Sequence, residues 1–373
     1  MTTNAERVYR EFGQSLWYDN LERGLLRSGA FRSLVEAGVR GCTSNPTIFE
    51  KAIRSSNEYD ASLKRLVQAN QSVEEIYYDL VVSDIQAAAD LLRPVYDGSE
   101  GRDGYISVEV QPRHASDTQA TIKEALELVG RIQRRNLMIK VPATEPGLEA
   151  ISSLIGQGIS VNVTLIFGVD QYRRVAEAYI QGLERAARAG LNLGAIASVA
   201  SFFVSRLDAV IDGELKKRAA GASPTEQARL NPLLGKAAIA NAKRAYRAFG
   251  ELFGSPRFAA LSGAQRQRVL WASTGTKDPA YPDTLYVDEL IGPDTVNTMP
   301  FETIDAFQDH GEVRDTLTEG VAESHALLRE LADAGVDYDD VTDTLEREGV
   351  EKFSDSFRTL RDGIDAKRAA LVA

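Results

Sequence analysis

Eight short runs rich in apolar and β-branched residues recur along this chain. They lie at residues 15–19, 38–46, 105–110, 136–142, 159–166, 195–203, 268–274 and 295–300. Most of them are separated by stretches with apolar residues at every third or fourth position, such as 117–135 and 168–190, which is the pattern of amphipathic helices. Alternating strands and helices indicate parallel βα units. Eight such units close into a (β/α)8 TIM barrel of the α/β class.

Two helical segments exceed what eight βα units require. Residues 208–266 are charged and helical in pattern, with breaks near 221–224 and 254–256. We expect them to form an enlarged connection between strands six and seven. Residues 315–373 are amphipathic and are expected to pack outside the barrel or over its mouth. The sequence therefore predicts one barrel domain, residues 1–373, with extra helices.

Charge and cysteine content limit the classes of function. The formal net charge of −11 argues against nucleic-acid or anionic-membrane binding, but it leaves room for a local basic pocket that takes a phosphorylated substrate. The single cysteine, Cys42, excludes an internal disulfide framework and suits a reducing cytosol. No segment resembles a signal peptide or approaches the roughly 18 apolar residues of a membrane span. We expect a cytoplasmic protein.

Polar residues inside these strands are informative, because barrel strands are covered on both faces. A charged or amide side chain there must face the interior, at the end where the pocket opens. Lys140 stands in the run NLMIKVP, and Glu109 stands in YISVEV. Asn162 and Thr164 share one face of SVNVTLI, since side chains alternate along a strand. Trp17 and Trp271 are expected to fill the barrel, with Trp271 also a candidate for the pocket edge.

These residues suggest a specific chemistry. Desolvation lowers the pKa of a lysine in a dry pocket, so that its neutral amine can form a Schiff base with a ketone. Glu109 and Asp19, which ends the first strand, are candidate proton carriers. Asn45, which follows the second strand, is a candidate to bind hydroxyls of a polyol together with Asn162 and Thr164. This chemistry needs no cofactor and no metal. The alternative for Lys140 is a structural ion pair with Glu109.

Two segments carry a resemblance to a known family. GCTSNPTIF (41–49) and LMIKVPATEPGLEAI (137–151) resemble the signature segments of the transaldolase family. The likeness continues through 159–167, 201–208 and 271–281, and the stretch 286–300 is similar to the long bacterial subfamily, which includes forms fused to glucose-6-phosphate isomerase. The resemblance implies Schiff-base transfer of a dihydroxyacetone unit between sugar phosphates.

The resemblance also implies roles for individual residues. Lys140 would be the nucleophile, Glu109 would move protons through a water, and Asp19 would take the proton of the C4 hydroxyl. Asn45, Asn162 and Thr164 would hold the dihydroxyacetone part and that water. A Ser-x-Phe-x-x-Arg pattern and the region after strand seven would supply pocket and phosphate contacts from Ser201, Phe203, Arg206 and Ser273.

The sequence departs from the family pattern at three places. Shorter members carry a second phosphate-binding arginine after strand seven, where this chain has STGTK, so Lys277 is the predicted substitute. The usual Ser-Pro-Phe is here Ser201-Phe202-Phe203. The distance in sequence from Asp19 to Asn45 is also long and contains a helix-forming insert.

Alternatives to a transaldolase are a class I aldolase that releases free dihydroxyacetone and a non-catalytic sugar-phosphate-binding barrel. Arg206 alone could instead pair with Asp208 or Glu184. The oligomeric state does not follow from the sequence.

Overall fold

The computed structural model describes residues 2–372 and contains a closed barrel of eight parallel strands, each hydrogen-bonded to the next in sequence and the last to the first. All eight predicted strands are present, and the (β/α)8 fold is confirmed. The strands are β1 (Ser15–Tyr18), β2 (Cys42–Thr43), β3 (Ile106–Glu109), β4 (Leu137–Pro142), β5 (Val161–Ile166), β6 (Ser198–Phe203), β7 (Arg268–Ala272) and β8 (Thr295–Met299).

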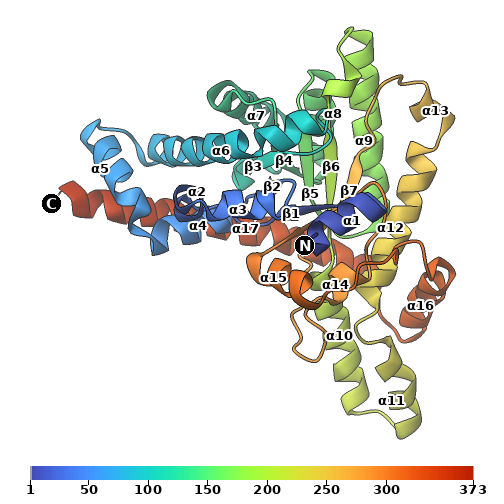
Figure 1. Ribbon diagram of the computed structural model, residues 1–373. Coiled ribbons are helices and arrows are strands. Elements are labelled where there is room, and N and C mark those ends of the chain that lie inside the picture. Colours follow the sequence, from blue (N-terminus) through green and yellow to red (C-terminus); the bar gives the residue numbers. More distant parts are fainter. Residues whose placement is uncertain (1, 373) are drawn as a thin grey trace.

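Helices surround the barrel (Figure 1). The α-helices are α1 (Asn4–Phe12), α2 (Arg23–Ser28), α3 (Ala30–Glu36), α4 (Pro46–Ser55), α5 (Asp60–Gln68), α6 (Val73–Gly98), α7 (Thr118–Ile132), α8 (Glu145–Gly156), α9 (Val169–Arg188), α10 (Ser205–Ala220), α11 (Pro224–Leu230), α12 (Ala237–Phe253), α13 (Pro256–Ala259), α14 (Leu285–Asp288), α15 (Phe301–His310), α16 (Val321–Asp333) and α17 (Tyr338–Val372). Short 3-10 helices are η1 (Asn57–Tyr59), η2 (Pro112–His114), η3 (Leu193–Ala195) and η4 (Asn231–Leu233). Among the described residues, no helix has an apolar stretch long enough to cross a bilayer.

The two helical additions lie where the sequence predicts them. Helices α10 to α13 connect β6 to β7, and the chain breaks as expected, since α11 and α13 each begin at a proline after a capping serine. Figure 1 shows α10 and α11 projecting from the barrel. The long helix α17 packs against α4, α5, α6 and α10 and reaches β5. The C-terminal segment therefore crosses the barrel at its mouth.

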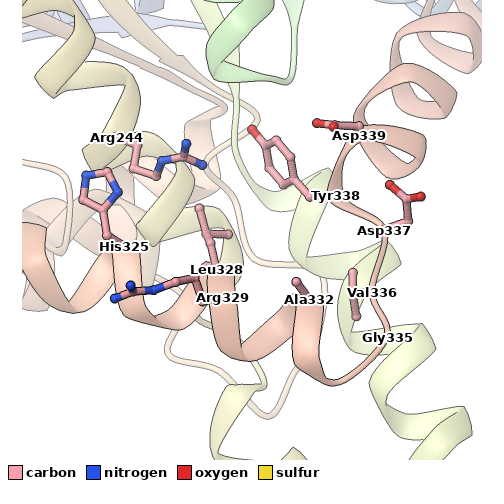
Figure 2. Close-up of a pocket in the computed structure, with 10 residues that line it drawn as sticks. All are labelled: Arg244, His325, Leu328, Arg329, Ala332, Gly335, Val336, Asp337, Tyr338 and Asp339. Atoms are coloured by element: carbon pink, nitrogen blue, oxygen red, sulfur yellow. The ribbon is translucent and has the colours of Figure 1, made fainter.

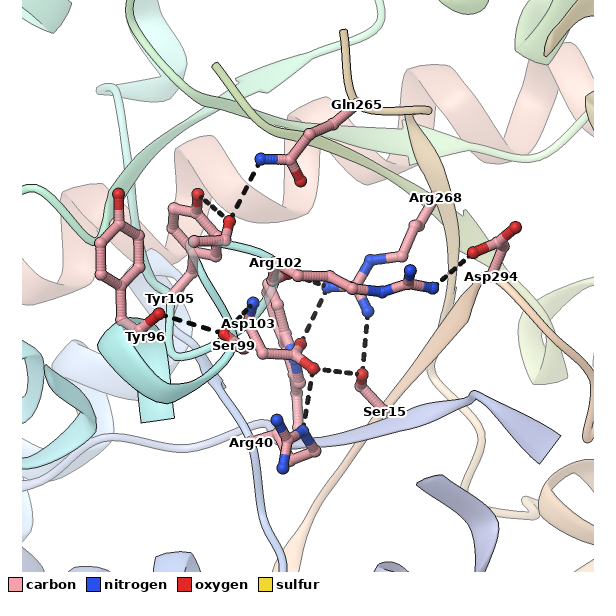
Figure 3. Close-up of polar contacts among 12 residues, drawn as sticks. Ser15, Arg40, Tyr96, Ser99, Arg102, Asp103, Tyr105, Gln265, Arg268 and Asp294 are labelled. Carbon is pink, nitrogen blue, oxygen red and sulfur yellow. Dashed lines mark hydrogen bonds and ion pairs between the residues drawn. The ribbon is translucent and has the colours of Figure 1, made fainter. Parts of the chain in front are cut away.

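A buried ionic network fills the barrel where its strands begin (Figure 3). The Asp103 carboxylate accepts from Arg268 and Arg40, both at 2.9 Å, and from the Ser15 hydroxyl at 2.7 Å. Burial would raise the pKa of Asp103, but the two guanidinium groups outweigh it and hold that pKa below its usual range. The network positions Arg268 beneath the Trp17 ring, 6.0 Å away.

The two tryptophans lie on different faces of the barrel wall. Trp17 fills the interior, and it passes so close to Gly41 that a Cβ there would lie 2.4 Å from its ring. Trp271 instead packs edge-on against Phe202, which in turn contacts Tyr172 of α9. The prediction that Trp271 fills the barrel or edges the pocket is therefore wrong. Its neighbour Ala272 faces the interior instead.

Candidate active site

A cavity of about 330 Å³ opens at the carboxyl ends of the barrel strands. Nine of the eleven predicted site residues line it: Asp19, Asn45, Lys140, Thr164, Ser201, Phe203, Arg206, Ser273 and Lys277. The other two, Glu109 and Asn162, are buried and contact residues that line it. This is the end of a (β/α)8 barrel at which loops and strand ends bring distant segments together.

Lys140 is buried beside Glu109 on the neighbouring strand. Its Nζ lies 3.4 Å from Glu109 Oε2, an ion-pair distance, and donates to the carbonyl oxygen of Ser44 at 3.4 Å. The strands β3 and β4 pair these two residues directly in register. Burial raises the pKa of Glu109 to about 7, although the Lys140 charge opposes that shift. Glu109 can therefore both accept and donate a proton near neutral pH.

Asp19 is held from a different side of the cavity. The Thr43 hydroxyl donates to Asp19 Oδ1 at 2.7 Å, and it lies 2.7 Å from the hydroxyl of Thr298, from which it can accept. Asp19 directly follows β1, while Thr43 and Thr298 come from β2 and β8, the two strands that flank it. This chain of hydroxyls fixes the orientation of the Asp19 carboxylate through Oδ1, and Oδ2 takes no part in the bond with Thr43.

Asn162 lies behind the cavity wall and does not line the cavity. Its amide donates to Ser107 Oγ at 3.1 Å, and its carbonyl oxygen accepts from Ser201 Oγ at 2.7 Å. These bonds link β3, β5 and β6 around Lys140. Thr164, two residues further along β5, has a buried hydroxyl with no hydrogen-bond partner among the described residues. A buried hydroxyl of this kind is available for a ligand or a water.

Asn45 has both a structural and a possible binding role. Its side-chain oxygen accepts from the backbone N–H of Ile48 at 3.0 Å and so caps α4, with Pro46 in the first turn. This is the turn geometry typical of an Asn-Pro pair. The amide nitrogen of the same side chain remains available to the cavity that Asn45 lines.

Two cations stand together on the rim of the cavity. Arg206 is half-buried, with its guanidinium 5.1 Å from the centre of the Phe203 ring. Burial lowers its pKa, and burial followed by the nearby Arg206 charge lowers the pKa of Lys277. Within residues 2–372, neither side chain has a carboxylate oxygen within 4 Å. Asp19 acts electrostatically on both cations from beyond that distance, and Glu348 acts on Arg206. Two cations close together are able to bind a phosphate group.

The surface ion pairs considered for Arg206 do not form. Asp208 accepts from Tyr286 and from the backbone of Ala238, and Glu184 pairs with Arg257 at 2.7 Å. Ser273 stands beside the cations in a left-handed backbone conformation, with φ at +57°. Its hydroxyl lies 3.0 Å from that of Ser205, which helps to hold this strained residue in place.

Sequence reasoning missed several residues of the cavity wall. Thr43 and Thr298 lie in predicted strands, and Thr43 stands two residues before Asn45, on the same face, so strand parity could have indicated it. Lys51 lies on the exposed side of α4. Phe353 comes from α17, and its ring centre is 5.7 Å from Lys140 Nζ. No local pattern signals Phe353, because its position depends on how α17 docks.

A larger groove, of about 750 Å³, lies between α12, α16 and the start of α17 (Figure 2). It is lined by Arg244, His325, Arg329 and Tyr338 among others, but by no lysine. It therefore lacks the buried amine and carboxylate that distinguish the smaller cavity, and size alone does not make it the reaction site.

Among the described residues, no group of three or more His, Cys, Asp or Glu side chains is arranged to hold a metal ion. His114 lies 3.5 Å from Glu124, His310 bonds to Asp283, and His325 lies near Arg247. Each of the three histidines thus has a polar neighbour of its own.

Known proteins resemble the chain over nearly its whole length. A family model described as Transaldolase/Fructose-6-phosphate aldolase matches residues 16–364. Transaldolase 1 of Streptomyces avermitilis is 50% identical over 365 residues, which cover 97% of this chain and 94% of that protein. Transaldolase 2 of a Nostoc species is 48% identical, and Transaldolase of Trichodesmium erythraeum is 46% identical, each alignment covering 98% of both proteins. The similarity spans the barrel and both helical additions.

Proposed function

This chain belongs to the transaldolase/fructose-6-phosphate aldolase family, and we propose that it is a transaldolase. Such an enzyme converts sedoheptulose 7-phosphate and glyceraldehyde 3-phosphate into erythrose 4-phosphate and fructose 6-phosphate, in the non-oxidative pentose phosphate pathway. One observation carries the assignment of the site. Lys140 is a buried amine beside Glu109, at the base of a cavity whose rim holds two cations with no carboxylate oxygen of residues 2–372 within 4 Å.

Lys140 is the nucleophile of this reaction. Its amine attacks the C2 carbonyl of the ketose, and loss of water gives an imine that is protonated on nitrogen. Making and hydrolysing this bond requires proton transfers at the carbonyl oxygen and at the leaving water. Glu109 performs them through a water molecule, since its pKa of about 7 suits both directions. The buried hydroxyl of Thr164, which has no hydrogen-bond partner among the described residues, supports a role in binding that water.

Asp19 drives cleavage of the carbon–carbon bond. It takes the proton of the C4 hydroxyl, the C3–C4 bond breaks, and its electrons pass to the iminium group to leave an enamine on Lys140. The aldose fragment departs, and a second aldose adds by the reverse sequence. Thr43 supports this role, because it donates to one oxygen of Asp19 and so fixes the carboxylate. Asn45, Ser201 and Phe203 surround the dihydroxyacetone part of the substrate. Asn162 accepts a hydrogen bond from the Ser201 hydroxyl and so orients it.

The phosphate of either substrate binds at the rim. Arg206 donates to it with its planar fork, and Lys277 adds a point charge where shorter relatives have arginine. The Ser273 hydroxyl is a third contact. The depth of the cavity then selects sugars that span the distance from Lys140 to this rim. The partners of the protein are thus sugar phosphates, and its location is expected to be the cytoplasm.

Two other functions are not favoured. A non-catalytic sugar-phosphate-binding barrel has no need for a buried lysine with two carboxylates of different environment. An aldolase that frees dihydroxyacetone uses the same residues, but the similar proteins named above are called transaldolases.

The experiment that tests the function mixes fructose 6-phosphate with erythrose 4-phosphate and measures sedoheptulose 7-phosphate and glyceraldehyde 3-phosphate. The parental protein should form both in equal amounts, and Lys140→Met should form neither. Lys243→Met is the matched control, because Lys243 is a buried lysine 4.0 Å from Glu289, outside the cavity. Formation of glyceraldehyde 3-phosphate without sedoheptulose 7-phosphate would point to the aldolase instead.

The chain is also proposed to be a single domain, residues 1–373. Support comes from the packing of its additions on the barrel: α12 contacts β7 and α9, and α17 contacts β5.

A further inference from the structure

Phe353 is an apolar side chain at the reacting end of the cavity, and we infer that it shields the dihydroxyacetone intermediate on Lys140 from water. The inference rests on the proposed function, because it takes Lys140 as the residue that carries the intermediate. On this inference, Phe353 favours transfer of the three-carbon unit to an aldose over its release as free dihydroxyacetone.

The surroundings of Lys140 Nζ differ in polarity from one side to another. Glu109 Oε2 and the carbonyl oxygen of Ser44 each lie 3.4 Å away, within the barrel wall. The Phe353 ring, with its centre 5.7 Å away, comes from the helix that crosses the mouth. Phe353 is itself buried, with 5% of its surface exposed. Its ring therefore occupies space above the amine that water from outside would otherwise fill.

Residues on α17 and on β5 both contribute to the close approach of α17 to the barrel. Gly349 stands one helical turn before Phe353, on the same face. A Cβ at Gly349 would lie 2.9 Å from Leu165 Cδ2, so a larger residue would displace either the Leu165 side chain or the helix. Leu165 has φ at +62°, where the register between β5 and β6 shifts. Glycine on the helix and this irregularity on the strand together let the helix come near Lys140.

Hydrogen bonds fasten α17 on both sides of Phe353. Before it, Glu346 accepts from the amide of Gln171 at 2.8 Å, and that amide also reaches the Leu165 carbonyl oxygen at 3.2 Å. After it, the hydroxyls of Thr47 and Ser356 lie 2.7 Å apart and tie the helix to α4. The ring is thus held by contacts with two separate parts of the barrel mouth.

The chemistry shows what such a ring would control. After the C3–C4 bond breaks, the enamine carbon can form a bond to an incoming aldehyde, whose oxygen takes a proton. Alternatively the same carbon takes a proton, a water oxygen adds to the imine carbon, and the C–N bond breaks to give dihydroxyacetone and free Lys140. Excluding water beyond the one needed for imine formation suppresses the second route. Glu109 and Thr164 keep a polar place for that one water.

The test incubates the protein with fructose 6-phosphate and no aldose, and follows both products. The parental protein should release a burst of one glyceraldehyde 3-phosphate per Lys140, followed by slow release of dihydroxyacetone. Phe353→Ala should keep the burst and raise the rate of dihydroxyacetone release at least severalfold. Phe353→Leu, which retains apolar cover, should fall between them. If the alanine variant does not fold, Phe353→Gln carries the same expectation, because it brings polar atoms to the same place.

Phe357→Ala is the matched control. Phe357 lies one turn further along α17, is buried, and packs edge-on against Tyr77 of α6 with ring centres 5.1 Å apart, outside the cavity. Its truncation should remove one packing contact between α17 and α6 and leave Phe353 over Lys140, so release should stay at the parental rate. Equal release from Phe353→Ala and the parental protein would overturn the inference, and so would an equal rise in Phe357→Ala. Absence of a burst in the parental protein would instead contradict the proposed function.

Discussion

Glu109 and Lys140 lie side by side on neighbouring strands, with 3.4 Å between Oε2 and Nζ, and both are buried. The pairing is compatible with a purely structural ion pair. What favours a reactive role is the setting: the amine opens to a cavity, and the pKa of the carboxylate is raised to about 7.

This raised pKa predicts how stability depends on pH. The unfolded chain ionises Glu109 near its usual pKa of 4.5, while the folded chain keeps the proton up to about pH 7. Between these values the folded state binds more protons, so the free energy of unfolding falls as pH rises. The loss is on the order of 3 kcal/mol. Glu109→Gln lacks this titration. Urea titrations between pH 4.5 and 7 should therefore show that the free energy of unfolding of the variant rises relative to that of the parental protein as pH rises.

Above pH 7 the difference in stability between Glu109→Gln and the parental protein should be constant. A difference that does not change between pH 4.5 and 7 would mean that Glu109 ionises normally in the folded protein.

Removal of Asp19 and removal of Glu109 should block different steps of the reaction. Asp19→Ala should still form an adduct with fructose 6-phosphate that borohydride traps, but release no glyceraldehyde 3-phosphate, because no base takes the C4 proton. Glu109→Ala should slow trapping itself. Single-turnover trapping and product release measure both. Thr43→Val is a graded control, since it removes the hydroxyl that orients Asp19 and should slow cleavage less than loss of Asp19 does. Cleavage by Asp19→Ala at the parental rate would reject the assignment.

Arg206→Ala should weaken binding of phosphorylated substrates. The expected cost is about 1.5–3 kcal/mol, seen chiefly as a higher KM, because a charge-assisted hydrogen bond to phosphate is lost. Lys277→Ala should cost less, since a lysine contributes a point charge without the planar fork. Arg329→Ala, in the groove of Figure 2, should leave the kinetics unchanged. Unchanged KM in Arg206→Ala would place the phosphate elsewhere.

Much of this site could be predicted because strand periodicity is local. A charged residue in an otherwise apolar strand has one face available to it, so parity predicts that Lys140, Glu109 and Thr164 face the interior. In the structure Lys140 and Thr164 line the cavity, and Glu109 lies beside Lys140. Trp271 shows the limit of the method. In β7 both faces carry bulky apolar residues, so parity does not reveal which face is inside. Phe353 could not be predicted at all, since it reaches Lys140 only through docking of a distant helix.

The opposite end of the barrel should govern stability and not reaction. Asp103→Ala would leave Arg40 and Arg268 without their buried counter-charge, at a cost of about 3–5 kcal/mol in the free energy of unfolding. Asp97→Ala removes a surface partner of Arg93 and should cost less than about 1 kcal/mol. Urea denaturation compares them. A loss below about 1 kcal/mol for Asp103→Ala would contradict a stabilising role for the network of Figure 3.

Borohydride trapping with peptide mapping tests the central claim most directly. The protein is incubated with fructose 6-phosphate, reduced, digested and analysed by mass spectrometry. The reduced dihydroxyacetone unit should appear on the peptide that contains Lys140, in up to one copy per chain, and should be absent without substrate or in Lys140→Met. A label on Lys243, Lys277 or another lysine, or no covalent label at all, would contradict the account.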